Sequence, residues 1–204
     1  YMDLEYSGQH WIKVFSGGNL TIINSTVTAA DPLNRYFVVV EENSLFYVGR
    51  STIEYAGYNT DPPYNRSGVW VATDNVTIED STFAHCLEAL VFYYAENLTV
   101  NGCFFTENGD GLFSYSSSNV KVLNSTFANN NYGFFGMETS NLVVSRCNFT
   151  GNYDDGVHLE GGSDICISDS LFTNTTWGGM DIGWPYGWPY GSSNVLVENC
   201  VLWD

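Results

Sequence analysis

The segment Asn119-Val-Lys-Val-Leu-Asn-Ser-Thr-Phe127 decides the fold, because close copies of it recur along most of the chain. Complete copies begin at six regularly spaced residues: Asn75, Asn97, Asn119, Asn141, Asp164 and Asn194. The spacings between them are 22, 22, 22, 23 and 30 residues. An earlier copy begins at Asn19 and a degenerate one at Ser44. A repeat with a nearly fixed period of this length is typical of a solenoid.

Each copy is preceded by a small residue and a short apolar alternation, as in Gly111-Leu-Phe-Ser114, Gly133-Phe-Phe-Gly136 and Gly156-Val-His-Leu159. One period therefore holds two or three short strands that are separated by turn residues. A strand–helix–strand unit needs about 30 residues or more, which is longer than the period. The period fits one coil of a β-solenoid, in which each strand pairs with its equivalent one coil away.

With these two halves, the repeat resembles the right-handed parallel β-helix of the pectate-lyase-like superfamily. It is similar in particular to the carbohydrate-binding and sugar-hydrolase repeats of secreted proteins and of archaeal surface-layer and sheath proteins. The resemblance implies an all-β, right-handed, single-stranded parallel β-helix of about eight coils. Enzymes, adhesins and structural layers share this fold, so the fold alone does not define the function.

We expect one β-helix domain over residues 1–204. Residues 1–67 are predicted to form irregular N-terminal coils, and residues 68–183 the regular coils. Residues 184–204 are predicted to form an aromatic loop insertion followed by the last coil, because a tandem Trp-Pro-Tyr-Gly begins at Trp184. Neither end of the chain shows an obvious cap, and exposed terminal strands can pair with another chain.

The composition excludes several classes of partner. The chain has 204 residues with 6 Lys+Arg and 23 Asp+Glu, and its formal net charge is −17. A nucleic-acid partner is not expected, because so few cations cannot neutralise phosphates. No apolar run approaches the roughly 18 residues that a membrane span requires. The hydrophobic content of 44% also excludes a disordered acidic tail.

Eight Asn-x-Ser/Thr sequons suggest a glycosylated, extracellular protein at the cell surface. Asn65 and Asn174 lie in loop-like stretches and are the first candidates for glycosylation, followed by Asn24, Asn124 and Asn148. Asn75 and Asn97 each open a predicted strand, so the repeat pattern itself explains these two sequons.

Three of the five cysteines occupy one column of the repeat, which is predicted to point inward: Cys103, Cys147 and Cys200. Neighbouring members of this column are two coils apart, about 9.6 Å, which is too far for a disulfide. We expect these residues to be small buried thiols.

Alternation along the predicted strands places an aromatic stripe on one outer sheet face, formed by Trp70, Tyr93, Phe113, Tyr115 and Phe135. A stripe of this size is expected to be covered by a partner, a loop or a sugar chain. The alternative is that the stripe belongs to the core. The loop residues Trp184, Tyr186, Trp188 and Tyr190 suit stacking on sugars, docking on a neighbouring subunit, or covering the stripe of their own chain.

Acidic residues and one histidine are the candidates for catalysis. Glu88, Asp110 and Asp155 share one column, and Asp155, His158 and Asp181 are predicted to lie close together on neighbouring coils. If the protein is an enzyme, these last three are the predicted catalytic residues. Asp154 and Asp155 are the candidate ligands if Ca²⁺ binds, and no other cofactor is expected.

The resemblance implies further residues that this chain does not show. Lyases of the superfamily use carboxylate-bound Ca²⁺ and an Arg or Lys base, and hydrolases use clustered aspartates. The hydrolase signature of paired Asp with Gly-His-Gly and Arg-x-Lys is absent, and no lyase arginine is identifiable. These departures argue more against an enzyme than for one.

Together these features predict an extracellular structural protein that assembles with copies of itself, such as a surface-layer, sheath or filament subunit. The alternative is a carbohydrate-active module, which binds or cleaves a neutral or weakly charged glycan as a binding domain, a lyase or a hydrolase.

Overall fold

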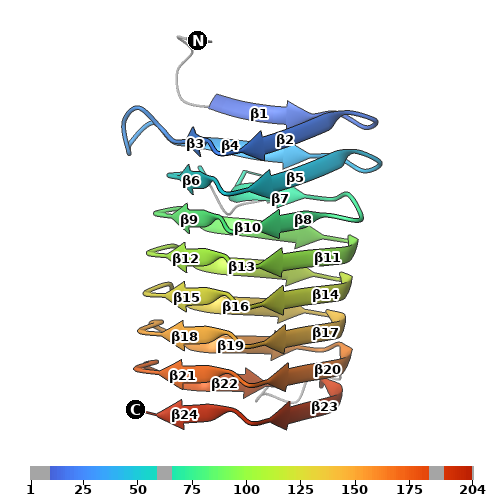
Figure 1. Cartoon of the computed structure of the whole chain (residues 1–204), viewed down its shortest axis with the longest axis vertical. Coiled ribbons are helices and arrows are strands. Elements are labelled where there is room, and N and C mark those ends of the chain that lie inside the picture. Colours follow the sequence, from blue (N-terminus) through green and yellow to red (C-terminus); the bar gives the residue numbers. More distant parts are fainter. Residues whose placement is uncertain (1–9, 59–65, 184–190, 204) are drawn as a thin grey trace.

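The structure is a computed structural model and describes residues 10–58, 66–183 and 191–203. These ranges contain β-strands and no helix, and the strands form three parallel sheets of eight strands each. Each coil contributes one strand to every sheet, and the coils stack along a single axis (Figure 1). The predicted all-β parallel β-helix of about eight coils is confirmed. The described residues include no helix long and apolar enough to cross a membrane.

The first sheet, which we call sheet A, consists of β1 (His10–Val14), β4 (Tyr36–Val40), β7 (Gly68–Val71), β10 (Glu88–Tyr93), β13 (Asp110–Tyr115), β16 (Tyr132–Met137), β19 (Asp155–Glu160) and β22 (Gly178–Ile182). Sheet B consists of β2 (Asn19–Ile23), β5 (Leu45–Gly49), β8 (Thr77–Glu79), β11 (Glu96–Asn101), β14 (Ser118–Leu123), β17 (Ser140–Ser145), β20 (Ser163–Ser168) and β23 (Ser193–Glu198).

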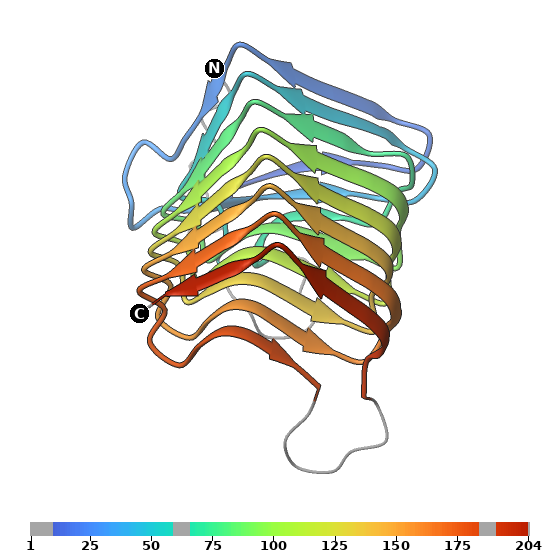
Figure 2. The ribbon, with the colours of Figure 1, turned by 60° about the horizontal axis from the view of Figure 1, so that its bottom comes forward.

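Sheet C has the shortest strands, which are β3 (Thr26–Val27), β6 (Thr52–Glu54), β9 (Thr82–Ala84), β12 (Phe104–Thr106), β15 (Thr126–Ala128), β18 (Asn148–Thr150), β21 (Leu171–Thr173) and β24 (Val201–Trp203). Seen from the C-terminal end, each coil bends at its corners, and the three sheets enclose one core (Figure 2).

Phenylalanines of sheet C form a continuous stack inside the helix: Phe83, Phe105, Phe127, Phe149 and Phe172. Their side chains are at most 1% exposed, and successive ring centroids lie 5.0, 4.7, 4.9 and 4.8 Å apart. These distances match the spacing of paired strands, about 4.8 Å. The parallel register therefore places each ring on the ring of the previous coil, which favours stacking along the whole core.

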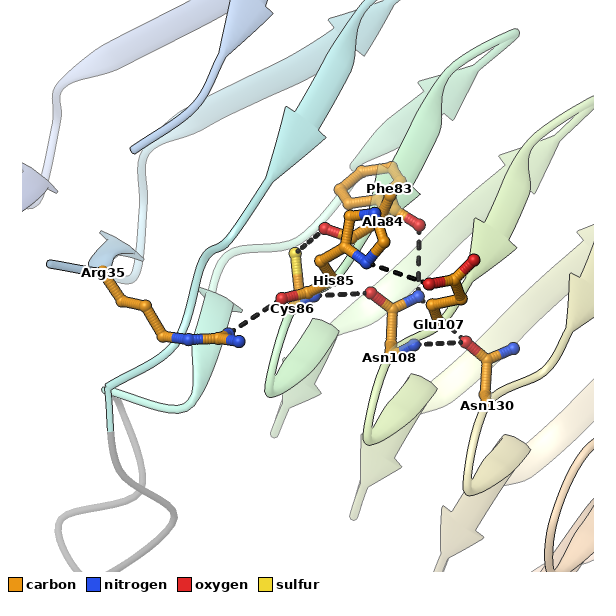
Figure 3. Close-up of polar contacts among 8 residues, drawn as sticks. All are labelled: Arg35, Phe83, Ala84, His85, Cys86, Glu107, Asn108 and Asn130. Atoms are coloured by element: carbon orange, nitrogen blue, oxygen red, sulfur yellow. Dashed lines mark hydrogen bonds and ion pairs between the residues drawn. The ribbon is translucent and has the colours of Figure 1, made fainter. Parts of the chain in front are cut away.

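Buried asparagines form a second ladder at the corner between sheets C and A (Figure 3). The Asn108 amide nitrogen donates to the carbonyl oxygen of Phe83 at 3.1 Å and to Oδ1 of Asn130 at 2.9 Å. Asn130 makes the equivalent contacts with Phe105 and with Asn152, both at 3.1 Å. These side chains satisfy backbone groups that would otherwise be buried without a hydrogen-bond partner.

The first residue of each complete repeat copy adopts a left-handed backbone conformation. Asn97, Asn119 and Asn141 have φ values of 58°, 53° and 49°. Asparagine tolerates this region better than other residues with a side chain, apart from aspartate. The recurrence of Asn or Asp at this position therefore reflects a turn geometry that is repeated once in each coil.

The five cysteines are free, which for Cys103, Cys147 and Cys200 agrees with the expectation from the spacing of their column. Cys103 and Cys147 are 2% and 3% exposed, and their thiols point at backbone carbonyl groups of the neighbouring coil. Cys200, in the last coil, is only partly buried. Burial raises the pKa of both the Cys103 and the Cys147 thiol to about 11, so these groups stay protonated and unreactive at neutral pH.

Replacing Asn130 with alanine is expected to destabilise the fold, because backbone groups of Phe105 and Asn108 lose their buried partners. The free energy of unfolding should fall by about 3 kcal/mol or more. Urea unfolding followed by tryptophan fluorescence measures this change. The matched control is Asn131→Ala, because the Asn131 side chain has no hydrogen bond with another described residue. Equal destabilisation by the two substitutions would contradict the ladder's role.

Candidate active site on the outer face of sheet A

Outward side chains of sheet A form rows that run along the helix axis. From β7 to β22, the parallel register places six residues in the central row: Trp70, Val91, Phe113, Phe135, His158 and Asp181. A second row contains Tyr93, Tyr115, Met137 and Glu160. A third row contains Glu88, Asp110 and Tyr132, and Asp155 holds the equivalent position on the next strand.

The aromatic stripe lies on the outside of the sheet, as predicted. The neighbouring inward residues Leu90, Leu112 and Phe134 are fully buried, whereas Phe113 and Phe135 are half-buried. The alternative that the stripe belongs to the core is therefore wrong. The period-2 pattern of a strand does not define which face is buried, and this is settled only by the packing of the other two sheets.

The rings of the stripe cover one another, which explains why they are only half-exposed. Tyr93 stacks on Tyr115 with 5.3 Å between ring centroids, and it lies at the same distance from Trp70. Phe113 and Phe135 have centroids 5.2 Å apart. The result is a ribbon of aromatic surface that extends over four coils.

An acidic cluster around His158 continues this ribbon toward the C-terminal end. His158 Nδ1 lies 2.9 Å from an oxygen of Asp155 and 3.8 Å from an oxygen of Asp181. His158 Nε2 lies 3.2 Å from Glu160. Asp155 is buried, whereas the Asp181 side chain is 43% exposed and faces solvent. The predicted proximity of Asp155, His158 and Asp181 is confirmed, and Glu160 joins them.

The carboxylates around His158 favour its protonated form. Burial by itself would lower the pKa of the imidazole, but the hydrogen bonds to Asp155 and Glu160 and the nearby charges outweigh it. The pKa of His158 is therefore raised above its ordinary value. A protonated imidazole donates from both ring nitrogens, so it holds Asp155 and Glu160 on its two sides.

Asp110 has the largest pKa change among the acidic side chains of this face. Burial, followed by the charges of Glu88 and Asp154, raises its pKa to about 7. The pKa of Glu88 is also raised, mainly by burial. Tyr132 lies beside Asp110 in the same row, and burial and a hydrogen bond to Asp154 raise its pKa. The face thus holds a carboxyl group that is protonated at mildly acidic pH next to ionised carboxylates.

The aromatic ribbon and the acidic cluster are in direct contact. The Phe135 ring meets the His158 ring edge-on with centroids 5.0 Å apart. The Tyr132 ring lies 5.4 Å from His158 and 5.2 Å from Phe135. A ligand lying on the aromatic ribbon would therefore reach the titratable groups without leaving the same sheet face.

The trio of Asp155, His158 and Asp181 also has the geometry of a metal site, with ligand atoms within 4.8 Å of one another. Calcium prefers six to eight oxygen ligands, which this set with an imidazole does not supply. Asp154, the other predicted calcium ligand, interacts with Tyr132. Calcium binding by Asp154 and Asp155 stays a prediction from the sequence.

The structure describes four of the five predicted glycosylation sites. Asn24 and Asn174 are exposed. Asn124 is exposed, and its amide nitrogen, to which a glycan would be attached, donates to Asn101 at 2.7 Å. Asn148 is half-buried. Asn65 lies outside the described residues, and glycosylation at all five stays a prediction.

Four predicted binding residues of the aromatic insertion also lie outside the described residues: Trp184, Tyr186, Trp188 and Tyr190. The sequence placed the other aromatic residues correctly on one face. Asp110 and Glu160 were among the acidic candidates in the sequence but were not selected as catalytic residues, and Tyr132 was not a candidate. The repeat shows which positions these residues occupy in successive coils. It does not show how deeply their side chains are buried or how far they lie from His158.

Comparisons with known proteins identify the fold. A family model described as "Right handed beta helix region" matches residues 10–176. The catalytic domain of Agl-KA superposes with a TM-score of 0.76 at 14% sequence identity, over 97% of this chain and 41% of that domain. This chain thus spans less than half of that domain. No curated protein sequence matches the chain.

Two further solved structures share less of the geometry. For the A-module of the Azotobacter vinelandii mannuronan C-5 epimerase AlgE6, the TM-score is 0.51 at 13% identity, covering 92% of this chain and 65% of the module. For PfbA, a surface adhesin of Streptococcus pneumoniae, the TM-score is 0.46 at 11% identity, covering 97% of this chain and 71% of that protein. At these identities the likeness concerns the fold alone.

The titration of Asp110 should make stability depend on pH. Its pKa is about 7 in the folded protein against an ordinary value of 3.8, so the folded state binds the proton more tightly than the unfolded state. Stability is therefore fully present below the unfolded pKa and decreases as pH rises through about 7. His158, with its raised pKa, acts in the same direction.

We expect the melting temperature to fall between about pH 5 and about pH 8, and Asp110→Asn to reduce this fall because the amide does not titrate. Differential scanning calorimetry across this range measures both slopes. Asp169→Asn is the matched control, since Asp169 lies in an exposed turn between sheets B and C. An identical pH slope in the native protein and in Asp110→Asn would contradict the assignment.

Proposed function

This chain belongs to the right-handed β-helix family, and from this basis we propose that it is a carbohydrate-active module that hydrolyses a glycan lying along the outer face of sheet A. The observation that carries the proposal is the contact between the aromatic ribbon and the acidic cluster through Phe135 and His158. Aromatic rings bind the apolar faces of large ligands and leave their polar edges free. Pairs of carboxyl groups supply the acid and the base of glycoside hydrolysis.

The residues of the face suit distinct roles in hydrolysis. Asp155 and Asp181 are the carboxyl pair, because their ligand atoms lie within 4.8 Å of each other, which is close to the separation of about 5–5.5 Å in retaining glycosidases. Asp181 is the exposed carboxylate and acts as the nucleophile at the anomeric carbon. Asp155 is the general acid and base, and His158 positions both side chains through its Nδ1 atom. Asp110 lies three coils from Asp181, about 14 Å along the axis, which is too far to act on the same glycosidic bond.

The proposed step balances as follows. The bond between the anomeric carbon and the glycosidic oxygen breaks while Asp155, in its protonated form, transfers its proton to that oxygen and the Asp181 carboxylate bonds to the anomeric carbon. Water then adds to the anomeric carbon, its proton passes to Asp155, and the bond between the anomeric carbon and Asp181 breaks. This second step restores the protonated Asp155 and the ionised Asp181.

The charge of the face favours a neutral glycan or one that bears amino groups. No Lys or Arg occurs in the sheet A strands β7, β10, β13, β16, β19 and β22, whereas these strands contain Glu88, Asp110, Asp155, Glu160 and Asp181. A polyuronate would bring a carboxylate to each of its sugar units and would be repelled. Elimination chemistry on uronates is disfavoured for the same reason, so hydrolysis is the better candidate.

The sequence favoured a different function, a structural subunit of a surface layer, sheath or filament. The convergence of titratable side chains on the aromatic ribbon favours the carbohydrate-active alternative, because a purely structural face has no need of a buried carboxyl group beside an ion-paired histidine. Self-association and an extracellular location at the cell surface stay predictions from the sequence.

Hydrolysis is tested on a panel of polymers: neutral α- and β-glucans, chitin, chitosan and polygalacturonate. We expect new reducing ends from at least one neutral or amino-sugar polymer. Asp155→Asn and Asp181→Asn should each lower the rate by about 100-fold or more, which is the usual contribution of general acid–base groups. Asp169→Asn should retain the rate. If no polymer yields reducing ends, or if Asp155→Asn is as active as the native protein, the proposal fails.

The negative charge of the sheet A face gives a separate prediction about which glycans bind. Chitosan should bind more tightly than polygalacturonate of matched length, and added salt should weaken chitosan binding because it screens the attraction to the carboxylates. Affinity electrophoresis in gels that contain each polymer, at low and high salt, measures both effects. Tighter binding of polygalacturonate would contradict the charge argument while leaving glycan binding itself intact.

A further inference from the structure

A hollow lies at the N-terminal end of the aromatic ribbon, on the same outer face of sheet A. Its volume is about 400 Å³, and it is lined by Ser16, Val39, Glu41, Glu42, Trp70 and Ala72. Val39 and Trp70 belong to the central outward row, because Val39 pairs with Trp70 in the parallel register. The hollow is therefore a continuation of the surface that leads to His158.

The hollow contains two carboxylates, of which one is held by other groups of the protein and one is not. The Glu41 carboxylate is held on both oxygens, by Lys13 Nζ at 2.6 Å and by the backbone N–H of Ser16 at 3.2 Å. Glu42 is exposed and has no hydrogen bond or ion pair with another described residue. The hollow thus offers one fixed carboxylate and one open carboxylate, which suits hydroxyl or ammonium groups of a ligand.

Trp70 supplies both an aromatic surface and an unused donor. Its ring lies 5.3 Å from that of Tyr93, the next aromatic residue of the ribbon. Its indole N–H is buried and has no hydrogen-bond partner among the described residues. An unpaired buried donor costs free energy, which an acceptor oxygen on a ligand would recover after a small movement of the ring.

We propose that this hollow is a distal subsite that binds one sugar unit of the glycan whose scissile bond lies at Asp155 and Asp181. This inference rests on the proposed function and extends it to the length of the substrate. Trp70 on β7 and His158 on β19 are four coils apart, which corresponds to about 19 Å along the axis. Only a glycan chain at least this long can occupy the subsite and the acidic cluster together.

The chemistry of the hollow defines the sugar it takes. A neutral hexose can stack on Trp70 and donate its hydroxyl groups to Glu41 and Glu42. An amino sugar adds an ammonium group that pairs with the open carboxylate of Glu42. A uronate is disfavoured here too, since the lining includes two glutamates, and only Glu41 is neutralised by an ion pair among the described residues.

The experiment uses Asp155→Asn protein, so that binding is measured without turnover. Isothermal titration calorimetry is performed with two series of oligosaccharides of two to eight units, one of β-1,4-linked glucose and one of β-1,4-linked glucosamine. We expect the affinity to rise roughly tenfold once the chain exceeds about 19 Å, a gain in line with one aromatic stacking contact. Adding Trp70→Ala should abolish this rise, and adding Trp70→Phe should retain part of it.

Two further variants test alternative explanations. Trp203→Ala removes an exposed tryptophan at the far end of sheet C and should leave the rise intact. Glu42→Gln keeps the shape of the hollow and should weaken binding of the long glucosamine chains by about threefold, with little effect on the glucose chains. This variant also keeps the test valid if Trp70→Ala does not fold.

The outcomes separate the subsite from the proposed function. The subsite is wrong, and the proposed function is not, if short chains bind but the affinity does not increase with chain length. The same holds if the increase in affinity with chain length persists in Trp70→Ala. Equal binding of long glucosamine chains by Glu42→Gln and its parent overturns the role of Glu42. If no oligosaccharide of either series binds and no polymer is cleaved, both the subsite and the proposed function are wrong.

Discussion

The whole structure depends on one constraint, which is that each strand pairs in parallel with its equivalent one coil away. Equivalent side chains then lie about 4.8 Å apart, a distance at which aromatic rings stack and a carboxamide reaches its neighbour. The Phe83–Phe172 stack and the Asn108–Asn152 ladder are the two internal results of this constraint. Each satisfies a different need of the core, because the rings fill its volume and the amides pair its buried backbone groups.

The same constraint acts on the outer face of sheet A, where it has an electrostatic result. Glu88 and Asp110 are neighbours in the register, and Asp155 and Asp181 approach His158 from the strand itself and from the next coil. Like charges at this spacing repel one another, and burial strengthens the effect. A raised pKa at Asp110 and a stabilised imidazolium at His158 follow from this crowding. The candidate site is therefore built on regular strands, which hold its groups rigidly.

The rows of sheet A also explain why an extended ligand suits this protein. Aromatic groups occupy the coils from β7 to β16, and the acidic cluster occupies β19 and β22, in the same rows. A small molecule would contact one or two coils and would use little of this surface. A polymer that runs parallel to the helix axis contacts all of it, with binding and chemistry at different points of the same row.

The sequence by itself determined the fold, since a period of 22 residues with alternating apolar positions fits one coil and excludes a helical crossover. It also determined the inward cysteine column and the recurrence of Asn at the left-handed turn. Only the tertiary structure decided that Trp70, Phe113 and Phe135 face outward, because a short apolar strand can bury either face. It alone brought Asp155, His158 and Asp181 within ligand distance of one another and buried Asp110 beside Glu88. Periodicity defines which residues are equivalent in successive coils, whereas exposure and interatomic distance depend on how the three sheets close around the core.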